Sequence, residues 1–426
     1  MQNRVSRRAM LAGILSLGAT ACLRGTSPQA RSPNQLVWAI GGADTASLER
    51  TTARLWNETH PDTPVRIDRL PNDADGQRIQ FGLELNAQGA GFDVLGTDVI
   101  WTGEFAEYGW IDPLEDLRAE AEQKILEGPL RTAIYQGQFW VMPYTSNVGF
   151  LYYRTDLVQT PPRTWDEAVQ VGRAAAEQAR IAPYVGQGAA YEGLVVNYLE
   201  LLWGAGGEVL TDDPFEVLFN TTDAAGIAAE FMRTSAQEGF YASSFNTMQE
   251  QQAQTTFAAG QAVLMRHWPS TFAVMADPAN SEVVGNYGIA PLPVFDPAET
   301  TGALGGFNLA VSRFSQKKDL AREFIRFASL DEQAQIALAE VSRPPVLKAA
   351  YEQLQDDPVM RLLGEVLPGA QPRPPVPFYN DISVAMQEQI FPAYTGQKPV
   401  PSALEAIQRS IQTTIDRRQQ ILEGAS

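Results

Sequence analysis

Cysteine and histidine are nearly absent from this chain of 426 residues, which has one cysteine, Cys22, and two histidines, His60 and His267. So small a supply excludes a zinc site built from clustered His and Cys ligands. It also leaves little material for a Ser-His-Asp or Cys-His catalytic centre. The chain has no G-x-G-x-x-G fingerprint, no G-x-x-x-x-G-K-[ST] phosphate loop and no EF-hand loop. We therefore expect no cofactor, no metal ion and no catalytic residues.

Positive charge is also scarce. The chain carries 32 Lys and Arg against 50 Asp and Glu, which gives a net charge of -18 at pH 7. Nucleic-acid binding needs a positive face that displaces counterions. Electrostatic attachment to anionic lipid needs a basic segment. We expect neither kind of partner, whereas a neutral ligand is compatible with this charge.

The apolar stretch near the N-terminus, residues 10–21, is too short to cross a bilayer, which takes about 20 apolar residues. It follows the pair Arg7 and Arg8 and ends in Ala19-Thr20-Ala21-Cys22. A basic start, a short apolar run and small residues before a cleavage point predict an export signal over residues 1–21. Since Cys22 is the only cysteine, the mature protein has no pair of thiols for a disulfide.

The paired arginines resemble a twin-arginine export signal, and the small residues before Cys22 resemble a bacterial lipoprotein cleavage box. The resemblance implies that Cys22 is acylated and becomes the new N-terminus. Residues 22–34, rich in Pro, Ser and Gly, would then tether the protein outside the cell membrane, in the periplasm or at the cell surface. The alternative is an ordinary signal peptide with an incidental cysteine, because Ala19 stands where the box usually has Leu. The export route, twin-arginine or general, stays open.

Strands and helices alternate from the start of the predicted fold. Residues 36–40 form an apolar strand, 47–59 a helix, 65–70 a strand, 78–88 a helix and 92–96 a strand. This order predicts βαβ units, an α/β class and a largely parallel sheet. Further strands are expected at 140–143, 149–153, 262–265, 288–293 and 307–311, and the chain beyond them is mostly helical. The length of the chain suits two domains.

Several short stretches, taken in order, resemble the extracellular solute-binding proteins of ABC importers, in their large sugar-binding class. They are DVIWTGEFA (98–106), GWIDPL (109–114), GQFWVMP (137–143), LYYR (151–154), WDEA (165–168), TFAAGQAV (256–263) and KDLAREFI (318–325). The resemblance covers essentially the whole mature chain. It implies the two-lobe periplasmic-binding-protein fold of type II, a binding function without catalysis, and delivery of the ligand to ABC permease subunits in the membrane. A monomer is expected.

The same resemblance implies that each lobe is discontinuous in sequence. The first lobe would comprise residues 35–149 and 293–341, and the second lobe residues 150–292 and 342–426. Three chain crossings near Gly149, Pro291 and Arg343 would form the hinge, and closure of the lobes would bury the ligand between them.

Within this class the chain looks most like trehalose-binding and trehalose/maltose-binding lipoproteins. The stretches that carry this narrower resemblance are DVIWTGEFA (98–106), EGLVV (192–196), GGFNLAV (305–311) and RPPVPFY (373–379). It implies an α-glucoside disaccharide as ligand, trehalose first and maltose second. A disaccharide offers flat C–H faces and a rim of hydroxyls, so its site needs aromatic rings together with carboxylates, amides and an arginine.

Trp268 resembles the family's sugar-stacking tryptophan, and Pro269 ends the strand before it. Covering a pyranose face removes ~80 Å² of apolar surface, which is worth about 2 kcal/mol. The alternative is a core tryptophan. Asp44 and Asp98 each follow a strand end, where α/β sheets place ligand groups. The alternative for both is a helix N-cap.

Glu192 and Arg373 resemble a family glutamate and arginine that reach the sugar. A first-turn charge on a helix and a surface arginine are the respective alternatives. Asn147 offers an amide to hydroxyls, or is a turn residue, and Tyr191 lies beside Glu192.

The pair Gly305 and Gly306 would let the backbone approach the sugar, or would form a tight turn before a strand. Tyr379 and Trp101 are weaker candidates, and we expect His267 to be packed or on the surface.

Two other functions stay open. A secreted glycoside hydrolase also needs aromatic rings and two carboxylates about 5–10 Å apart, and Asp98 with Glu192 are the pair to consider. A binder of another oligosaccharide or of a polyol-type ligand, such as a longer maltodextrin, a plant disaccharide or a glycerophosphodiester, is the alternative within the class.

Overall fold

The computed structural model describes residues 34–41, 45–211, 216–295 and 302–424. The predicted signal peptide, the acylation site Cys22, nearly all of the predicted tether and the candidate Asp44 lie outside the described residues. Among the helices of the described part, none is both long enough and apolar enough to span a membrane.

The first sheet has the strand order β13-β12-β3-β1-β2, and β4 and β7 also pair with β12. Its strands are β1 (Leu36–Ile40), β2 (Val65–Arg69), β3 (Val94–Asp98), β4 (Ile111–Asp112), β7 (Met142–Asn147), β12 (Ala303–Ser312) and β13 (Gln371–Pro372). All five residues of β1 are buried, and β1 lies between β3 and β2 inside the sheet. Trp38 packs edge-on against Tyr144 of β7 at 5.5 Å between ring centroids.

The second sheet has the strand order β11-β8-β10-β9. Its strands are β8 (Phe150–Arg154), β9 (Ala182–Val185), β10 (Ala262–His267) and β11 (Tyr287–Ala290). Both sheets are mixed, whereas the sequence predicts mostly parallel strands. The early strands β1, β2 and β3 run parallel to one another, as expected for βαβ units. Strand β12, in contrast, runs antiparallel to β3, β4 and β7.

We call the first sheet with the helices packed around it the first lobe. These helices are α1 (Thr45–Leu48), the π-helical turn η1 (Glu49–Ala53), α2 (Arg54–Thr59), α3 (Ala74–Asn86), α4 (Thr102–Glu107), α5 (Arg118–Lys124), α6 (Glu127–Arg131), α12 (Lys318–Leu330) and α13 (Glu332–Ala339). Short 3-10 turns η2 (Val99–Trp101) and η3 (Glu115–Leu117) and the hairpin β5 (Ile134–Tyr135) with β6 (Gln138–Phe139) complete it. In α12, Phe324 and Ile325 face the core, and Phe324 contacts Trp38.

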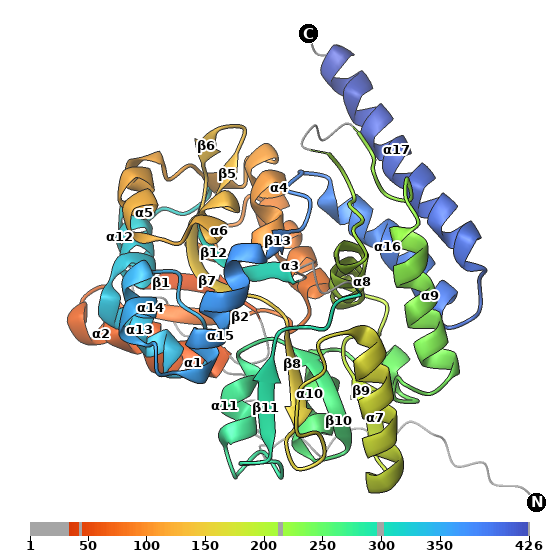
Figure 1. Cartoon of the computed structure of the whole chain (residues 1–426). Coiled ribbons are helices and arrows are strands. Elements are labelled where there is room, and N and C mark those ends of the chain that lie inside the picture. Colours follow the sequence, from red (N-terminus) through yellow and green to blue (C-terminus); the bar gives the residue numbers. More distant parts are fainter. Residues whose placement is uncertain (1–33, 42–44, 212–215, 296–301, 425–426) are drawn as a thin grey trace, which may run out of the picture.

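The second lobe contains the second sheet and most of the later helices (Figure 1). They are α7 (Trp165–Ala179), α8 (Glu192–Gly204), α9 (Ala224–Gln237), η4 (Phe245–Thr247), α10 (Glu250–Ala258), α11 (Thr271–Ala276), α15 (Pro358–Val366), η5 (Leu367–Gly369), α16 (Tyr379–Tyr394) and α17 (Val400–Gly424). Helix α14 (Lys348–Gln353) contacts α13 of the first lobe and α15. A capping box begins α7, where the Glu167 N–H donates to Thr164 Oγ1 at 3.2 Å. Helices α8, α9, α16 and α17 pack on one another at one side of the molecule.

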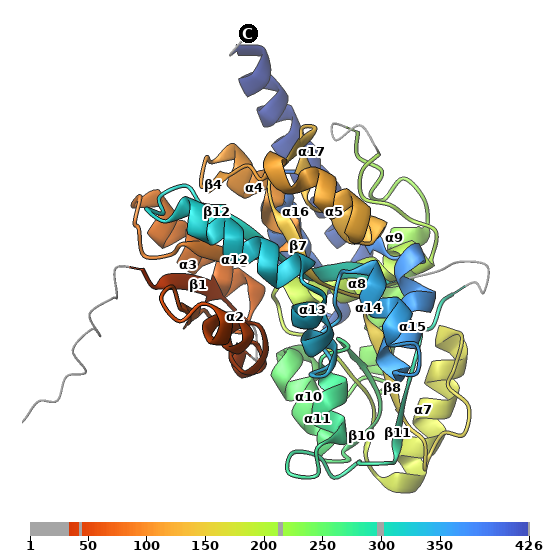
Figure 2. The same ribbon diagram turned by 90° about the vertical axis from the view of Figure 1, so that its left-hand side faces the viewer.

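The chain passes between the two sheets where crossings are predicted. Only Val148 and Gly149 separate β7 of the first sheet from β8 of the second. The second passage leads from β11 past Pro291 to β12. Near Arg343, whose Nε donates to Ser47 Oγ at 3.0 Å, the chain leaves α13, which packs on η1, and continues through α14 to α15, which contacts β11 (Figure 2). The lobe boundaries themselves stay a prediction.

Candidate functional site

Arg373 joins the two lobes at the centre of the candidate site. It follows β13, whose Pro372 lies opposite Leu304 of β12. Arg373 Nη1 donates to Glu192 Oε1 at 2.7 Å, and Nη2 donates to Asp98 Oδ1 at 2.9 Å. Burial alone lowers the pKa of Arg373, but the two carboxylates outweigh it and raise the pKa overall. One buried cation thus pairs with two of the predicted acidic residues.

Glu192 is the first residue of α8, and its carboxylate is enclosed by hydrogen-bond donors. Tyr379 Oη donates to Oε1 at 2.8 Å, and Ser383 Oγ donates to Oε2. Burial raises the pKa of Glu192, while Arg373, Ser383 and Tyr379 act in the opposite direction. Tyr379 therefore belongs to this cluster, whereas the sequence ranks it as a weaker candidate.

Three further polar residues join the cluster, and none of them is predicted from the sequence. Ser383 and Gln387 lie four and eight residues after Tyr379 on one face of α16, and Gln387 Nε2 donates to Ser383 Oγ at 2.9 Å. Asp75, on the first turn of α3, accepts from the Glu192 N–H at 3.3 Å and from Gln387 Nε2 at 3.4 Å. A carboxylate of the first lobe thus caps a helix of the second lobe. Burial raises the pKa of Asp75. The four-residue spacing of Tyr379, Ser383 and Gln387 is the pattern in the sequence that indicates a shared face of α16.

Asp98 takes the N-cap role that the sequence gives as its alternative, and it also pairs with Arg373. It ends β3, and its Oδ1 accepts from the Ile100 N–H at 3.2 Å, which makes it the N-cap of η2. The same oxygen accepts from Arg373. The side chain is 18% exposed, so the carboxylate is accessible at the edge of the sheet. Trp101, in contrast, is buried and stacks on Phe105, so it belongs to the core.

Trp268, Asn147 and Gly305 lie together at the start of β12. Gly305 lies opposite Asn147 in the register of β12 and β7. A Cβ atom on Gly305 would lie 2.4 Å from Asn147 Oδ1 and 3.1 Å from Trp268 Cζ3, so only glycine leaves this space open. Asn147 Oδ1 is buried without a hydrogen-bond partner among the described residues, and so is Arg373 Nε. Trp268 is half-buried.

The backbone explains why glycine occupies position 306, and no ligand is needed for this explanation. The φ of Gly306 is +134°, and a Cβ there would lie 2.1 Å from Thr145 O of β7. The two glycines lie inside β12, which begins four residues before the predicted strand, and do not form a turn. The close pairing of β12 with β7 therefore accounts for Gly306, while Gly305 faces Trp268.

Tyr191 and His267 are buried beside the cluster. Tyr191 Oη donates to Glu250 Oε2 at 2.7 Å, and burial raises the pKa values of Tyr191 and Glu250. His267 Nε2 bonds Glu250 O at 3.0 Å, and His267 Nδ1 bonds Thr271 Oγ1 at 2.5 Å. His267 is packed, which is one of the two outcomes that the sequence leaves open, and Tyr191 is the N-cap residue of α8.

A pH titration tests the burial of His267. Burial lowers its pKa from 6.5 to about 4. Between about pH 4 and 6.5 the unfolded chain binds one proton more than the folded chain, so the free energy of unfolding falls as the pH falls through this range. The full effect is about 3 kcal/mol. We expect His267→Gln to remove this part of the slope in denaturant unfolding measured at several pH values. Glu250 remains in both proteins, so its titration cancels in the difference. Parallel curves for the two proteins would contradict the prediction.

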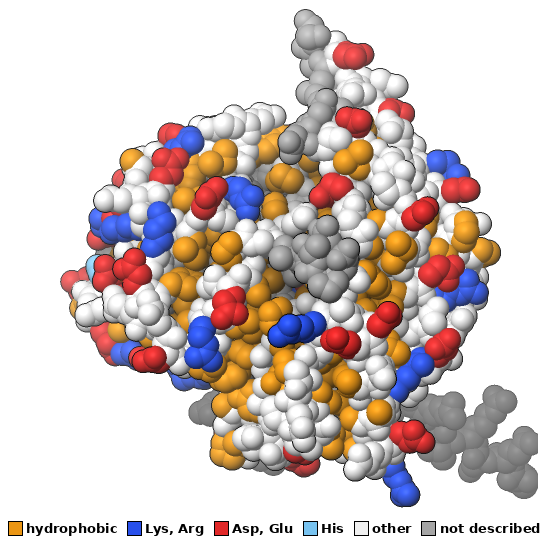
Figure 3. All heavy atoms as spheres, in the orientation of Figure 1, with side chains coloured by type: hydrophobic (Ala, Val, Ile, Leu, Met, Phe, Trp, Pro, Cys, Tyr) orange, Lys and Arg blue, Asp and Glu red, His pale blue; other side chains and the backbone are white. Residues whose placement is uncertain are grey.

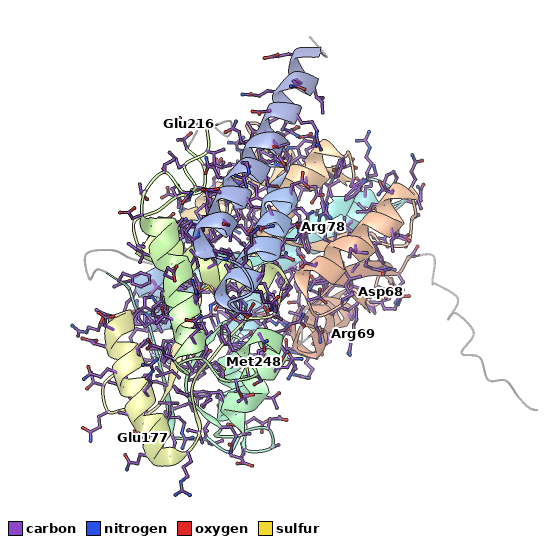
Figure 4. All side chains as sticks on the ribbon, turned by 90° about the vertical axis from the view of Figure 1, so that its right-hand side faces the viewer. Asp68, Arg69, Arg78, Glu177, Glu216 and Met248 are labelled. Atoms are coloured by element: carbon purple, nitrogen blue, oxygen red, sulfur yellow. The ribbon has the colours of Figure 1, made fainter. Side chains whose placement is uncertain are left out.

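A second contact between the lobes lies at the rim. Arg418 of α17 pairs with Glu107 of α4, which also accepts from Tyr135 Oη at 2.7 Å. Beside this contact is a hollow of about 120 Å³ lined in part by Arg78 and Tyr108. Figure 4 labels Arg78 on α3, close to the blue helices α16 and α17. A larger hollow of about 290 Å³ lies near Trp56 and His60 on the first lobe.

Neither of these two hollows is lined by Asp98, Glu192 or Trp268. Asp98, Glu192 and Arg373 bond one another instead, so a ligand that binds them must take over some of these bonds. On the face that Figure 3 shows, Lys and Arg side chains are interspersed with Asp and Glu and form no basic patch there.

Comparison with known proteins gives consistent matches over most of the chain. The "Probable ABC transporter-binding protein" of Deinococcus radiodurans is 25% identical over 364 residues, which cover 81% of this chain and 85% of that protein. The "Mannitol-binding protein" of Pseudomonas aeruginosa is 24% identical over 405 residues, which cover 87% and 90%. The solved structure of maltose-bound T. maritima MalE3 is 29% identical, covers 89% of this chain and 99% of that chain, and superposes with a TM-score of 0.84.

A tagatose-bound solute-binding protein from Thermotoga lettingae is 22% identical and has a TM-score of 0.81, with 90% of this chain and 100% of that chain covered; it shows the shared fold. Together with the two mixed sheets and their crossings, these likenesses confirm the predicted two-lobe fold of periplasmic binding proteins. Residues 40–335 match the family described as bacterial extracellular solute-binding protein. This match covers more than half of the chain, and the chain therefore belongs to the family of bacterial extracellular solute-binding proteins.

Proposed function

We propose that this protein captures an α-linked glucose disaccharide, trehalose before maltose, and delivers it to the permease of an ABC sugar importer. The observation that supports this most is the assembly around β12. Its register brings Trp268, Asn147 and Gly305 to one place, next to the Arg373 bridge. The similarity to maltose-bound MalE3 and the resemblance to trehalose-binding lipoproteins favour a disaccharide over other sugars.

The residues of the site offer the chemistry that a disaccharide needs. Trp268 supplies an apolar ring for a pyranose face. Asp98 and Glu192 accept hydroxyl hydrogens, and charge-assisted bonds of this kind are strong. Arg373 Nε and Asn147 Oδ1, both buried without partners among the described residues, are a donor and an acceptor for sugar hydroxyls. An unpaired buried group costs about 1–3 kcal/mol, so a ligand that pairs both is favoured.

Closure of the two lobes would select the ligand in this proposal. Asp98 and Asn147 come from the first lobe, while Glu192 and Trp268 come from the second. Arg373 already spans both, so a bound disaccharide would compete for its donors and insert between the lobes.

Cys22 would carry the lipid that holds the protein at the outer side of the membrane. A Cys22→Ser variant should be released into the medium or the soluble periplasmic fraction.

A polyol-type ligand is the alternative that one relative favours, since a mannitol-binding protein covers nearly the whole chain. An open-chain polyol has no ring face to stack, so its binding would depend little on Trp268. The glycoside hydrolase alternative loses support, because the family is one of binding proteins. In addition, Asp98 and Glu192 are held by one guanidinium.

Calorimetry with the mature protein tests the proposal directly. Trehalose, maltose, maltotriose, sucrose and mannitol are titrated in turn. Tight one-to-one binding of trehalose or maltose supports the proposed ligand. Binding of mannitol alone would move the assignment to polyols, and heat from none of the five would remove the disaccharide assignment and leave the family as it stands.

A further inference from the structure

We propose that Arg266 is a positioning residue that holds the ring of Trp268 in place and connects it, through Glu200, to the chain crossings between the lobes. The inference rests on the proposed function, in which Trp268 stacks on a sugar. It concerns residues that the sequence does not single out, since Arg266 and Glu200 lie in a strand and a helix whose neighbours are apolar.

Arg266 and Glu200 form a fully enclosed ion pair inside the second lobe. Their side chains are 1% and 3% exposed. Arg266 Nε donates to Glu200 Oε2 at 2.9 Å, and Nη2 donates to Oε1 at 2.5 Å. Nη1 donates to Gln187 Oε1 at 3.2 Å, and Asn197 Nδ2 donates to the same oxygen at 3.0 Å. The guanidinium is thus fixed in its plane by a two-pronged contact and a third bond.

The fixed guanidinium lies over the ring of Trp268. Arg266 Cζ is 4.0 Å from the ring centroid, which is the geometry of a cation–π contact. The backbone of Trp268 is held as well, since Tyr152 Oη donates to Trp268 O at 2.9 Å. One face of the indole is therefore covered by the cation, and the opposite face is the one that can receive a pyranose.

The same ion pair contacts two of the chain crossings. Glu200 Oε1 accepts from the N–H of Ala303, the first residue of β12, at 3.3 Å. A Cβ on Gly149, between β7 and β8, would lie 2.6 Å from Arg266 Nη2 and 2.7 Å from Glu200 Oε1. If either crossing changes its path, the ion pair of Arg266 with Glu200 must move, and the ring of Trp268 that packs on Arg266 must move with it. The position of the sugar-stacking ring is coupled in this way to the lobe arrangement.

Stability alone gives a weak reason for this pair. A buried ion pair often contributes nothing net relative to apolar residues of similar volume, because desolvation offsets the attraction. The double variant Arg266→Met with Glu200→Leu removes both charges together and avoids an unpaired buried charge. Stability and ring position can then be separated in one experiment.

The full chain is labelled with 5-fluorotryptophan, and the resonance of Trp268 is assigned by its loss in Trp268→Phe. In the double variant we expect a small change in Tm, a shifted and broadened Trp268 resonance, and trehalose affinity lowered about tenfold. The matched control is Arg78→Met with Glu104→Leu, which removes a less buried ion pair, from the first lobe. The control should leave the resonance unchanged. If the double variant fails to fold, Arg266→Lys is used, because it keeps the charge and loses the two-pronged contact.

An unchanged Trp268 resonance in the Arg266 variants would overturn the positioning role, whatever happens to affinity. If the parent protein binds no sugar, the proposed function fails. The resonance still decides the role of Arg266, because it is measured without ligand.

Discussion

The variant Arg373→Ala is expected to lose measurable disaccharide binding. The substitution leaves Glu192 buried and Asp98 only 18% exposed, both without their shared cation. Breaking a buried pair by removing one partner costs about 3–5 kcal/mol, which corresponds to a roughly 100- to 4000-fold loss if it falls on the closed, ligand-bound form. Calorimetry gives the affinity, and thermal unfolding gives the share of the loss that falls on the fold.

Two further variants separate the role of Arg373 from general effects. Arg373→Lys keeps the charge but cannot bridge two carboxylates with one planar group, so we expect partial recovery. Arg326→Ala removes an arginine whose pair with Glu120 lies on the exposed surface, and it should bind as the parent does. Binding by Arg373→Ala within threefold of the parent would remove Arg373 from the site.

The variant Trp268→Ala is expected to bind trehalose roughly 30-fold more weakly. Loss of ~80 Å² of apolar contact corresponds to about 2 kcal/mol. Trp268→Phe keeps a smaller ring and should lie between the two. Tyr108→Ala serves as the matched control, since Tyr108 is a 59% exposed aromatic residue outside the cluster. If mannitol is the ligand, Trp268→Ala should lower its affinity only slightly, and this result would favour the polyol alternative.

The sequence predicts the elements of this fold better than the contacts between them. Local patterns predict β1, β3 and the helices α12, α13, α15, α16 and α17, because apolar spacing reports burial directly. The start of α3 is predicted four residues late. Asp73, whose Oδ1 accepts from the Gly76 N–H at 2.7 Å, begins the helix before its apolar pattern does. This shift hides Asp75 as a first-turn residue that faces α8.

The same limit explains which site residues were found. Glu192 and Arg373 came from family resemblance and Asp98 from its place after a strand. Their convergence depends on contacts across 181 and 275 residues of chain. No local pattern contains that information. The Arg266 and Glu200 pair carries no signal in sequence, because each is one charged residue in an apolar segment whose partner is 66 residues away.

The contact of Arg418 with Glu107 has a practical use in reporter design. It ties the C-terminal helix to α4, so opening of the lobes would separate the two helices. Tyr108 and Ile421 are exposed positions next to its two ends. Because Cys22 is the only native cysteine, Tyr108→Cys and Ile421→Cys in a Cys22→Ser background would accept dyes at two chosen places. Energy transfer between the dyes would then turn the binding protein into an optical sugar sensor.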